Sequence, residues 1–225
     1  MTKHLVRDLV NLKKLLLQVG AMVEEATNQA ITALTERRSD IASAVIENDA
    51  EIDSKEVLIE EECLKILALH QPVASDLRFV IAALKVNNDL ERMGDQAVNI
   101  AERAAALASQ PPLGIPLNVN RMADVVKQMV RSSLDAHVNL DTELALSVCR
   151  MDDEVDEMNR EMFAVLQDHM CTEPEVSVQA VQYLSASRDL ERIADLATNI
   201  AEDVVFMVEG EVIRHRGGLV QPDTQ

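Results

Sequence analysis

Two acidic segments, one hundred residues apart, carry the side chains whose types and spacing best suit chemistry. They run from Asp89 to Glu102 and from Asp189 to Glu202, and ten of their fourteen positions are identical. At about 100° per residue in a helix, the acidic and amide side chains of each segment share a sector of roughly 80°. They are Glu91, Asp95, Asn99 and Glu102 in the first segment, and Glu191, Asp195, Asn199 and Glu202 in the second. Each segment therefore predicts one acidic helix face.

A second pair of acidic segments, Asp49–Asp53 and Asp152–Asp156, precedes these motifs at an offset of 103 residues. The same helical geometry aligns Asp49, Asp53, Glu56 and Glu60 in the first half, and Asp152, Asp156 and Asn159 in the second. Carboxylates four residues apart repel by a few tenths of a kcal/mol per pair, and no Lys or Arg on the same face offsets this. A hard cation shared between two such helices would offset the repulsion, so these faces are candidate metal sites. The alternative is that the faces are simply solvated.

The elements that must position these faces are long helices, because Gly and Pro number only six each. Apolar residues at helical spacing and the positions of the breakers predict helices near 3–35, 40–69, 73–108, 118–140, 143–171 and 175–209. Pro72 and Pro174 stand before the third and the sixth helix, and the region 111–116 contains three Pro and one Gly. The sequence therefore predicts an all-α protein of two tandem, duplicated three-helix bundles, at 1–110 and 117–212, with a linker at 111–116 and a flexible tail at 213–225.

Composition narrows the function classes. Aromatic residues make up only 2% of the chain, which argues against a β-sandwich or barrel. Thirty-nine acidic and twenty-one basic residues give a formal charge of -18, so binding to nucleic acid or directly to an anionic membrane is not expected. Three cysteines without a C-x-x-C pair and the absence of a long apolar run favour a cytoplasmic protein.

Signatures of common enzymes are missing from the sequence. There is no H-E-x-x-H, P-loop, G-x-G-x-x-G or G-x-S-x-G motif, and no Glu-x-x-His pair of the kind that di-iron oxidases use. The five histidines lie outside the acidic motifs, and each is interpreted as a surface or capped residue rather than a ligand. A regulatory interaction module is the leading hypothesis. The alternatives are a metal-dependent phosphohydrolase, whose clustered carboxylates would activate water, and a plain helical scaffold.

The acidic motifs also carry a family resemblance. The segment Asp89–Glu102, its repeat at Asp189–Glu202 and the segment Gln71–Arg78 resemble the signatures of the PhoU family of phosphate-uptake regulators, and the likeness covers nearly the whole chain. Two departures stand out. Ala194 replaces the usual glycine that Gly94 provides in the first half, and the second half has no counterpart of Gln71–Arg78, whose role stays open.

The resemblance implies surface clusters of several metal ions on paired carboxylate motifs. It assigns Asp49, Asp53, Glu91 and Asp95 to one cluster and Asp152, Asp156, Glu191 and Asp195 to the other, with Asn99, Glu102, Asn199 and Glu202 as possible additional ligands. Oxygen ligands suit magnesium, calcium, manganese or oxidised iron, and zinc stays open. Arg92 and Arg192 are expected to brace the acidic faces or to pair with Asp89 and Asp189 rather than to bind an anion.

The resemblance further implies a negative regulator of phosphate uptake and of phosphate-starvation signalling, acting as an adaptor and not as an enzyme. Its partners would be the ATPase subunit of the phosphate ABC transporter and a membrane-bound sensor histidine kinase. The protein is then expected in the cytoplasm, peripheral to inner-membrane complexes that it reaches through these proteins rather than through lipid. A homodimer is also expected.

Overall fold

Long antiparallel helices make up the protein in a computed structural model that describes residues 3–115 and 117–210. The first repeat contains α1 (Lys3–Glu36), α2 (Ser39–His70) and α3 (Ala74–Ala108). The second contains α4 (Val119–Asn139), α5 (Thr142–Thr172), the 3₁₀ turn η1 (Pro174–Val176) and α6 (Ser177–Glu209). The predicted all-α fold of two three-helix repeats is confirmed. The exact domain limits stay predictions, and the predicted tail at 213–225 lies outside the described residues.

The helix ends follow local backbone chemistry. Arg37, Gln71 and Leu140 adopt positive φ angles of 57°, 46° and 53°, and each terminates the helix before it. Two predicted starts are corrected. The third helix begins at Ala74 because Val73 is extended, and Pro174 opens the 3₁₀ turn, so that α6 starts only at Ser177. Proline tolerates such first-turn positions because it has no amide proton to leave unpaired.

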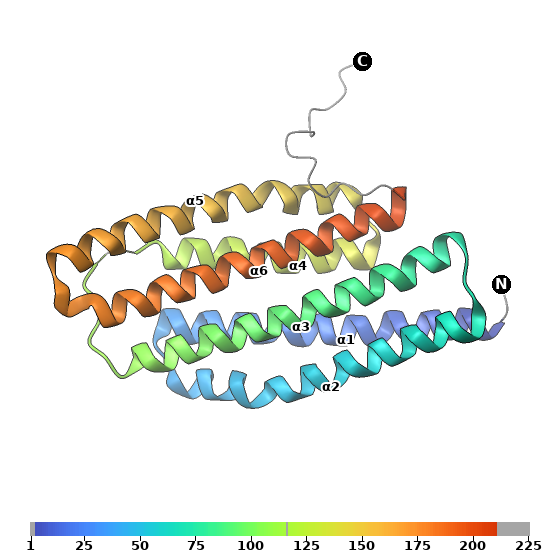
Figure 1. Cartoon of the computed structure of the whole chain (residues 1–225), viewed down its shortest axis with the longest axis horizontal. Coiled ribbons are helices and arrows are strands. Elements are labelled where there is room, and N and C mark those ends of the chain that lie inside the picture. Colours follow the sequence, from blue (N-terminus) through green and yellow to red (C-terminus); the bar gives the residue numbers. More distant parts are fainter. Residues whose placement is uncertain (1–2, 116, 211–225) are drawn as a thin grey trace, which may run out of the picture.

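Figure 1 shows the two repeats lying side by side, with α3 and α6 running antiparallel between them. Between the repeats, α3 packs extensively against α6, and α1 also packs against α4. Both α3 and α6 therefore bury one side in their own repeat and another side against the neighbouring repeat. This explains why they hold more buried residues than the outer helices α2 and α5.

On the side away from their acidic residues, both acidic segments carry an apolar stripe. Its members are all buried, at Leu90, Met93, Ala97, Ile100 and Ala101 in α3, and at Leu190, Ile193, Ala197, Ile200 and Ala201 in α6. Burial of such side chains stabilises a fold by about 25 cal/mol for each Å² of apolar surface. Because these stripes face the core, the opposite faces that carry the acidic residues remain at or near the surface.

Polar contacts also join the repeats. The Lys85 ammonium lies 3.1 Å from the Asp203 carboxylate and 5.0 Å from the ring centroid of Phe206. Burial raises the pKa of Asp189, and the charges of Arg103 in the other repeat and of Arg192 act against this shift. In these two contacts the first repeat thus contributes the bases, Lys85 and Arg103, and the second contributes the acids, Asp203 and Asp189.

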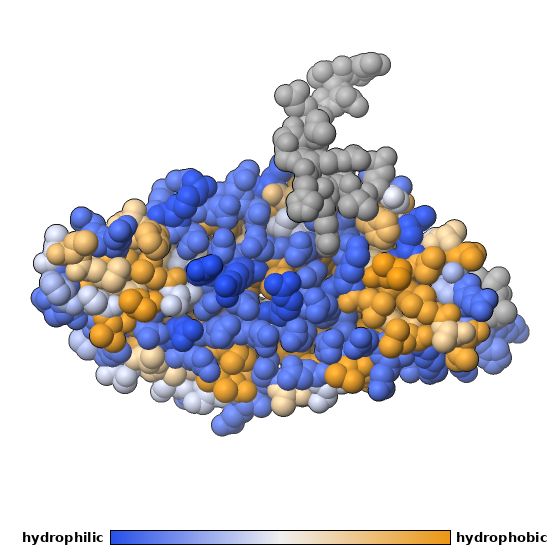
Figure 2. All heavy atoms as spheres, in the orientation of Figure 1, coloured by the Kyte–Doolittle hydropathy of each residue, from blue (hydrophilic) through white to orange (hydrophobic). Residues whose placement is uncertain are grey.

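Hydrophilic and apolar side chains are distributed unevenly along the surface of the molecule (Figure 2). On the face shown in Figure 2, hydrophilic surface covers the middle of the molecule, and apolar surface gathers toward its two ends. Exposed apolar side chains near the α2–α3 turn include Leu69 and Val73, and those near the start of α6 include Val178 and Val181. Within residues 3–115 and 117–210, no helix is both long enough and apolar enough to cross a membrane.

Candidate metal centre

The first candidate cluster lies where α2 packs against α3. Asp49, Asp53 and Glu56 come from α2, and Glu91 and Asp95 come from α3. The buried Asn87 amide of α3 donates a hydrogen bond of 3.0 Å to the backbone carbonyl of Glu56. This bond fixes the register of the two helices at the cluster.

The pKa values show that the carboxylates of the two helices share one patch. Burial raises the pKa of Asp49, and the negative charges of Asp53 and Asp95 raise it further. Burial likewise raises the pKa of Glu91, with Asp95, Glu56 and Asp53 as the main charged neighbours. Like charges act on one another in this way only when they are close together. The structure therefore brings the first set of predicted residues together.

Gly94 lets Asp49 approach the backbone of α3. A Cβ atom at this position would lie 3.4 Å from Asp49 Oδ1 and 3.5 Å from Ile52, which is ordinary contact. The Asp49 carboxylate thus lies close to the backbone of α3 at Gly94, a position between Glu91 and Asp95 in the sequence. A methyl group would therefore fit at this position, as the alanine does at the matching position 194 of the second repeat.

The second candidate cluster repeats the arrangement between α5 and α6. Burial and the charges of Asp195 and Asp156 raise the pKa of Asp152 to about 6, while the Thr198 hydroxyl acts in the opposite direction. Burial raises the pKa of Glu191 and of Asp195 as well, and Asp156 raises both further. All four predicted carboxylates of the second set therefore lie in one patch too.

One position of the second cluster has a different residue and a different hydrogen bond from its counterpart in the first. Asn159 of α5 stands where the first repeat has Glu56, and its side-chain oxygen accepts a hydrogen bond of 2.6 Å from the Ser187 hydroxyl. Ser187 in turn stands where the first repeat has Asn87. The second cluster consequently holds one carboxylate fewer on its middle helix.

The four possible additional ligands differ in how close they lie to the carboxylate clusters. Glu202 lies close enough to Cys149 on α5 to raise the pKa of its thiol, together with burial and Asp152. Burial is the main cause, and the pKa of Cys149 rises to about 11. Asn199 lines a hollow between the repeats with Arg92 and Arg192. Asn99 is half-buried and Glu102 is exposed on α3. Glu202 is thus the member of this group best placed beside a cluster.

Sequence reasoning missed Cys149 as a neighbour of the second cluster. It precedes Asp152 by three residues, so both side chains fall on the same side of α5. That spacing was the available signal. The thiol is half-buried, and its raised pKa keeps it protonated at neutral pH, which makes it a poor metal ligand in this arrangement.

The arginines of the two motifs lie where the repeats meet. Arg192 Nη1 is 3.9 Å from Asp189 Oδ1, which agrees with the expected pairing. The charge of Arg92 lowers the pKa of Asp195 in the other repeat, although burial outweighs it. Arg92, Gln96, Arg192 and Asp195 line one hollow between α3 and α6. The first repeat therefore acts electrostatically on the cluster of the second.

The donor chemistry of both patches fits a hard cation. Their side chains offer carboxylate oxygens, which magnesium, calcium, manganese and oxidised iron accept. Burial, followed by the charges of neighbouring carboxylates, raises the pKa values in both patches, and a bound cation would offset this cost of negative charge. In the described parts of the chain, however, no three His, Cys, Asp or Glu side chains already form a cage for a metal ion. Binding would therefore require the carboxylates to turn toward the ion.

The interpretation of the five histidines as surface or capped residues is wrong for His137. His70 Nε2 lies 2.9 Å from Asp8 Oδ2, as expected of a satisfied histidine. His137, interpreted from the sequence as a surface or capped residue, is instead buried on α4. Among the residues that the structure describes, its Nδ1 atom has no hydrogen-bond partner. Neither histidine lies at the carboxylate clusters.

Comparison with known proteins adds the family. The profile of the PhoU domain matches the chain twice, over residues 16–104 and 119–204. The chain belongs to the PhoU family. Each match contains one of the carboxylate clusters and all three helices of one repeat, apart from helix ends.

Several relatives of this PhoU-family protein match it over nearly its full length. A phosphate-specific transport system accessory protein PhoU homolog from Aquifex aeolicus is 39% identical, over 94% of this chain and 96% of the relative. A homolog of the same name from Pseudomonas putida is 41% identical, over 93% of this chain and 82% of the relative. The crystal structure of PhoU from Pseudomonas aeruginosa superposes with a TM-score of 0.89 at 38% identity, covering 91% of this chain and 99% of that structure.

Family membership settles one alternative. PhoU proteins are regulatory accessory proteins and form a non-enzymatic family. The prediction that this protein is not an enzyme is therefore confirmed, and the phosphohydrolase alternative is set aside. The metal assignment of the clusters stays a prediction.

Proposed function

We propose that this protein is a negative regulator of phosphate-specific transport, which keeps phosphate-starvation signalling off when phosphate is plentiful. The observation that carries the proposal is the PhoU repeat, present twice and shared over nearly the full length with relatives named as phosphate-specific transport accessory proteins. The protein acts by contact with partners rather than by chemistry.

The proposed partners are the ATPase subunit of the phosphate ABC transporter and the sensor histidine kinase of the same response. An adaptor needs two surfaces, and the duplicated bundle supplies two related ones on a rigid frame. Because the net charge is -18, contact with these complexes would run through protein surfaces with basic patches rather than through anionic lipid. The protein would act in the cytoplasm, next to the inner membrane, as a homodimer.

The carboxylate clusters are proposed as metal sites that prepare these surfaces. Asp49, Asp53, Glu91 and Asp95 would hold one group of ions, and Asp152, Asp156, Glu191 and Asp195 the other. The crowded carboxylates with raised pKa values in both repeats support this assignment. A bound cation supplies fixed positive charge, which changes an acidic patch from repelling an acidic partner to bridging it.

A reporter of phosphate starvation tests the regulatory role. Deletion of the gene should turn the reporter on in phosphate-rich medium, and reintroduction of the intact gene should turn it off again. A reporter that stays off after deletion contradicts the proposed function, whatever metals the protein binds. Retention of the purified protein on the transporter ATPase and on the cytoplasmic part of the kinase, measured separately, tests the two adaptor contacts.

Elemental analysis tests the metal sites one repeat at a time. The first variant combines Glu91→Gln with Asp95→Asn, and the second combines Glu191→Gln with Asp195→Asn. Each should lose the metal of its own repeat. A control with Glu61→Gln and Glu161→Gln removes two exposed carboxylates of α2 and α5 outside the clusters and should keep all the metal. Equal metal content in all three proteins, or none in the wild type after loading, contradicts the assignment.

A further inference from the structure

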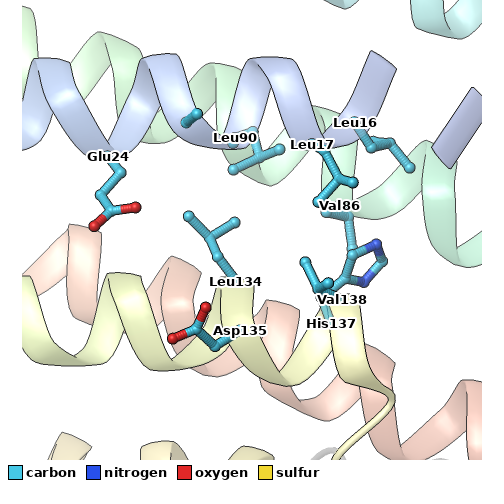
Figure 3. A pocket seen from close by; sticks show the side chains of 11 residues that line it. Leu16, Leu17, Glu24, Val86, Leu90, Leu134, Asp135, His137 and Val138 are labelled. Atoms are coloured by element: carbon cyan, nitrogen blue, oxygen red, sulfur yellow. The ribbon is translucent and has the colours of Figure 1, made fainter. Parts of the chain in front are cut away.

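A cavity of about 170 Å³ lies where α1 and α3 of the first repeat meet α4 of the second (Figure 3). Leu16, Val86 and Leu90 are buried residues of its wall, and Leu134 and Val138 of α4 close it from the other repeat. The wall is mostly apolar. The volume is close to that of an engineered apolar cavity of about 150 Å³ that holds benzene, so it suits a molecule of one ring.

One polar atom in this wall has no partner. His137 is only 7% exposed, and its Nδ1 makes no hydrogen bond within the described structure. Figure 3 shows its ring rising from α4 into the gap beneath α1. Burial lowers the pKa of His137 to about 4, with the nearby Lys13 charge acting in the same direction, so the ring is neutral at pH 7. A buried polar atom left unpaired costs free energy, which a hydrogen-bonding occupant would recover.

The mouth of the cavity selects by charge. Glu24 extends from α1 toward α4, and Asp135 lies on α4 beside Leu134 (Figure 3). The Lys13 ammonium also lies nearby, where it donates a hydrogen bond of 3.2 Å to the backbone carbonyl of Val138. The two carboxylates outweigh this single positive charge and so disfavour an anion, and the apolar wall behind them disfavours any charged group that would have to lose its water. A neutral occupant is therefore favoured.

We propose that this cavity is a binding site for a small, neutral, mostly apolar molecule that carries one hydroxyl group. A hydroxyl both donates and accepts, so it satisfies His137 Nδ1 in either neutral tautomer of the ring. The rest of the molecule fills the space between Leu16, Val86 and Leu134. The occupant contacts both repeats and so favours the arrangement in which they are packed together. The site is separate from the carboxylate clusters and does not depend on the proposed regulatory function.

Methyl NMR on the full-length protein tests the site with three probes of similar size. Phenol should shift the methyl signals of Leu16, Leu134 and Val138. Toluene, which lacks the hydroxyl, should bind more weakly, by about fivefold for the loss of one ordinary hydrogen bond. Benzoate should not bind, because of its charge. No shift with phenol at millimolar concentration overturns the proposal, and so does benzoate binding as tightly as phenol.

Two variants separate the hydroxyl from the cavity. His137→Phe keeps a ring but removes Nδ1, so phenol and toluene should bind it equally. Ala21→Leu adds a larger side chain at the exposed rim and should weaken all binding, whereas Ala68→Leu on an exposed part of α2 should not. Circular dichroism confirms that each variant is folded. If His137→Phe still prefers phenol by the wild-type ratio, or Ala21→Leu and Ala68→Leu bind alike, the proposed site is wrong.

Discussion

Asp49 in the first repeat and Asp152 in the second stand at matching positions of the middle helices, but their surroundings differ. Asp49 packs over Gly94 and belongs to a cluster in which Glu56 adds a further carboxylate. Asp152 is more deeply buried, faces Thr198 and has a pKa of about 6. The second repeat also buries His137, Asp189 and Asp203, whereas among the buried residues described in the first, Asp89 is the one Asp, Glu, His, Lys or Arg.

The two repeats thus keep carboxylates at matching positions, but the burial of these carboxylates and the free-energy cost of their charge differ. The first cluster offers more ligand atoms at a more exposed site. The second offers fewer, in a place where each charge is more costly. We therefore expect the two clusters to bind metal at different metal concentrations. We also expect the pH dependence of the free energy of unfolding to arise mainly from groups of the second repeat. The following tests are ordered by the size of the expected effect.

The largest effect is expected at His137. Its pKa is about 4 in the folded protein against 6.5 for a free histidine, so the unfolded chain takes up a proton first as pH falls. Stability should therefore decrease between pH 6.5 and about 4, by about 3 kcal/mol. His137→Phe should remove this part of the loss in urea unfolding, whereas His4→Phe at the exposed start of α1 should not. Hydrogen exchange at low pH should show α4 opening first, and earlier opening of α2 would contradict the comparison.

The next effect concerns the opposite charges of the two repeats, Lys85 with Asp203 and Arg103 with Asp189. Lys85→Met keeps the apolar stem near Phe206 but leaves the buried Asp203 without this ammonium, and should cost about 2 kcal/mol. Arg103→Met should cost less, about 1 kcal/mol, because Asp189 keeps Arg192 at 3.9 Å. Chemical unfolding measures both losses, with Lys14→Met on an exposed part of α1 as the control. Equal losses would show that the two pairs are equivalent after all.

A smaller effect is expected when single carboxylates are neutralised in protein stripped of metal by a chelator. The pKa of Asp152 is raised from 3.8 to about 6, so its favourable contribution is present below pH 3.8 and is lost as pH rises through 6. Asp152→Asn should therefore stabilise the protein at pH 7, by about 1 kcal/mol once solvent screening is allowed for, and should do nothing at low pH. Asp49→Asn should act in the same direction but less. The reverse order in thermal unfolding would contradict the difference in burial.

The smallest effect is expected from exchanging the glycine and the alanine at matching positions. Gly94→Ala should stabilise by about 0.5 kcal/mol, because alanine loses less backbone entropy in a helix than glycine and its methyl group would meet Asp49 and Ile52 at ordinary contact distance. Ala194→Gly should destabilise by about 1 kcal/mol, since α6 already accommodates the methyl group. Thermal unfolding of both variants checks the signs. A destabilising Gly94→Ala would mean that the Asp49 carboxylate cannot yield.

Much of this architecture could be predicted from the sequence, because helical periodicity and the few breakers are local signals. The same periodicity placed Glu91 with Asp95 and Glu191 with Asp195 on common faces, and the structure brings them to the middle-helix carboxylates as expected. Local patterns could not predict how the repeats meet. The proximity of Lys85 to Asp203, the effect of Arg92 on Asp195 and the burial of His137 all depend on packing between segments far apart in sequence.

The antiparallel contact of α3 with α6 also has a consequence for folding of the chain during its synthesis. One side of α3 packs against α6, which is synthesised after the other described helices. Until then the first repeat, though complete in its own three helices, exposes the side of α3 that α6 later covers, and Lys85 lacks Asp203. Nascent chains stalled or truncated before α6 should therefore recruit chaperones or aggregate.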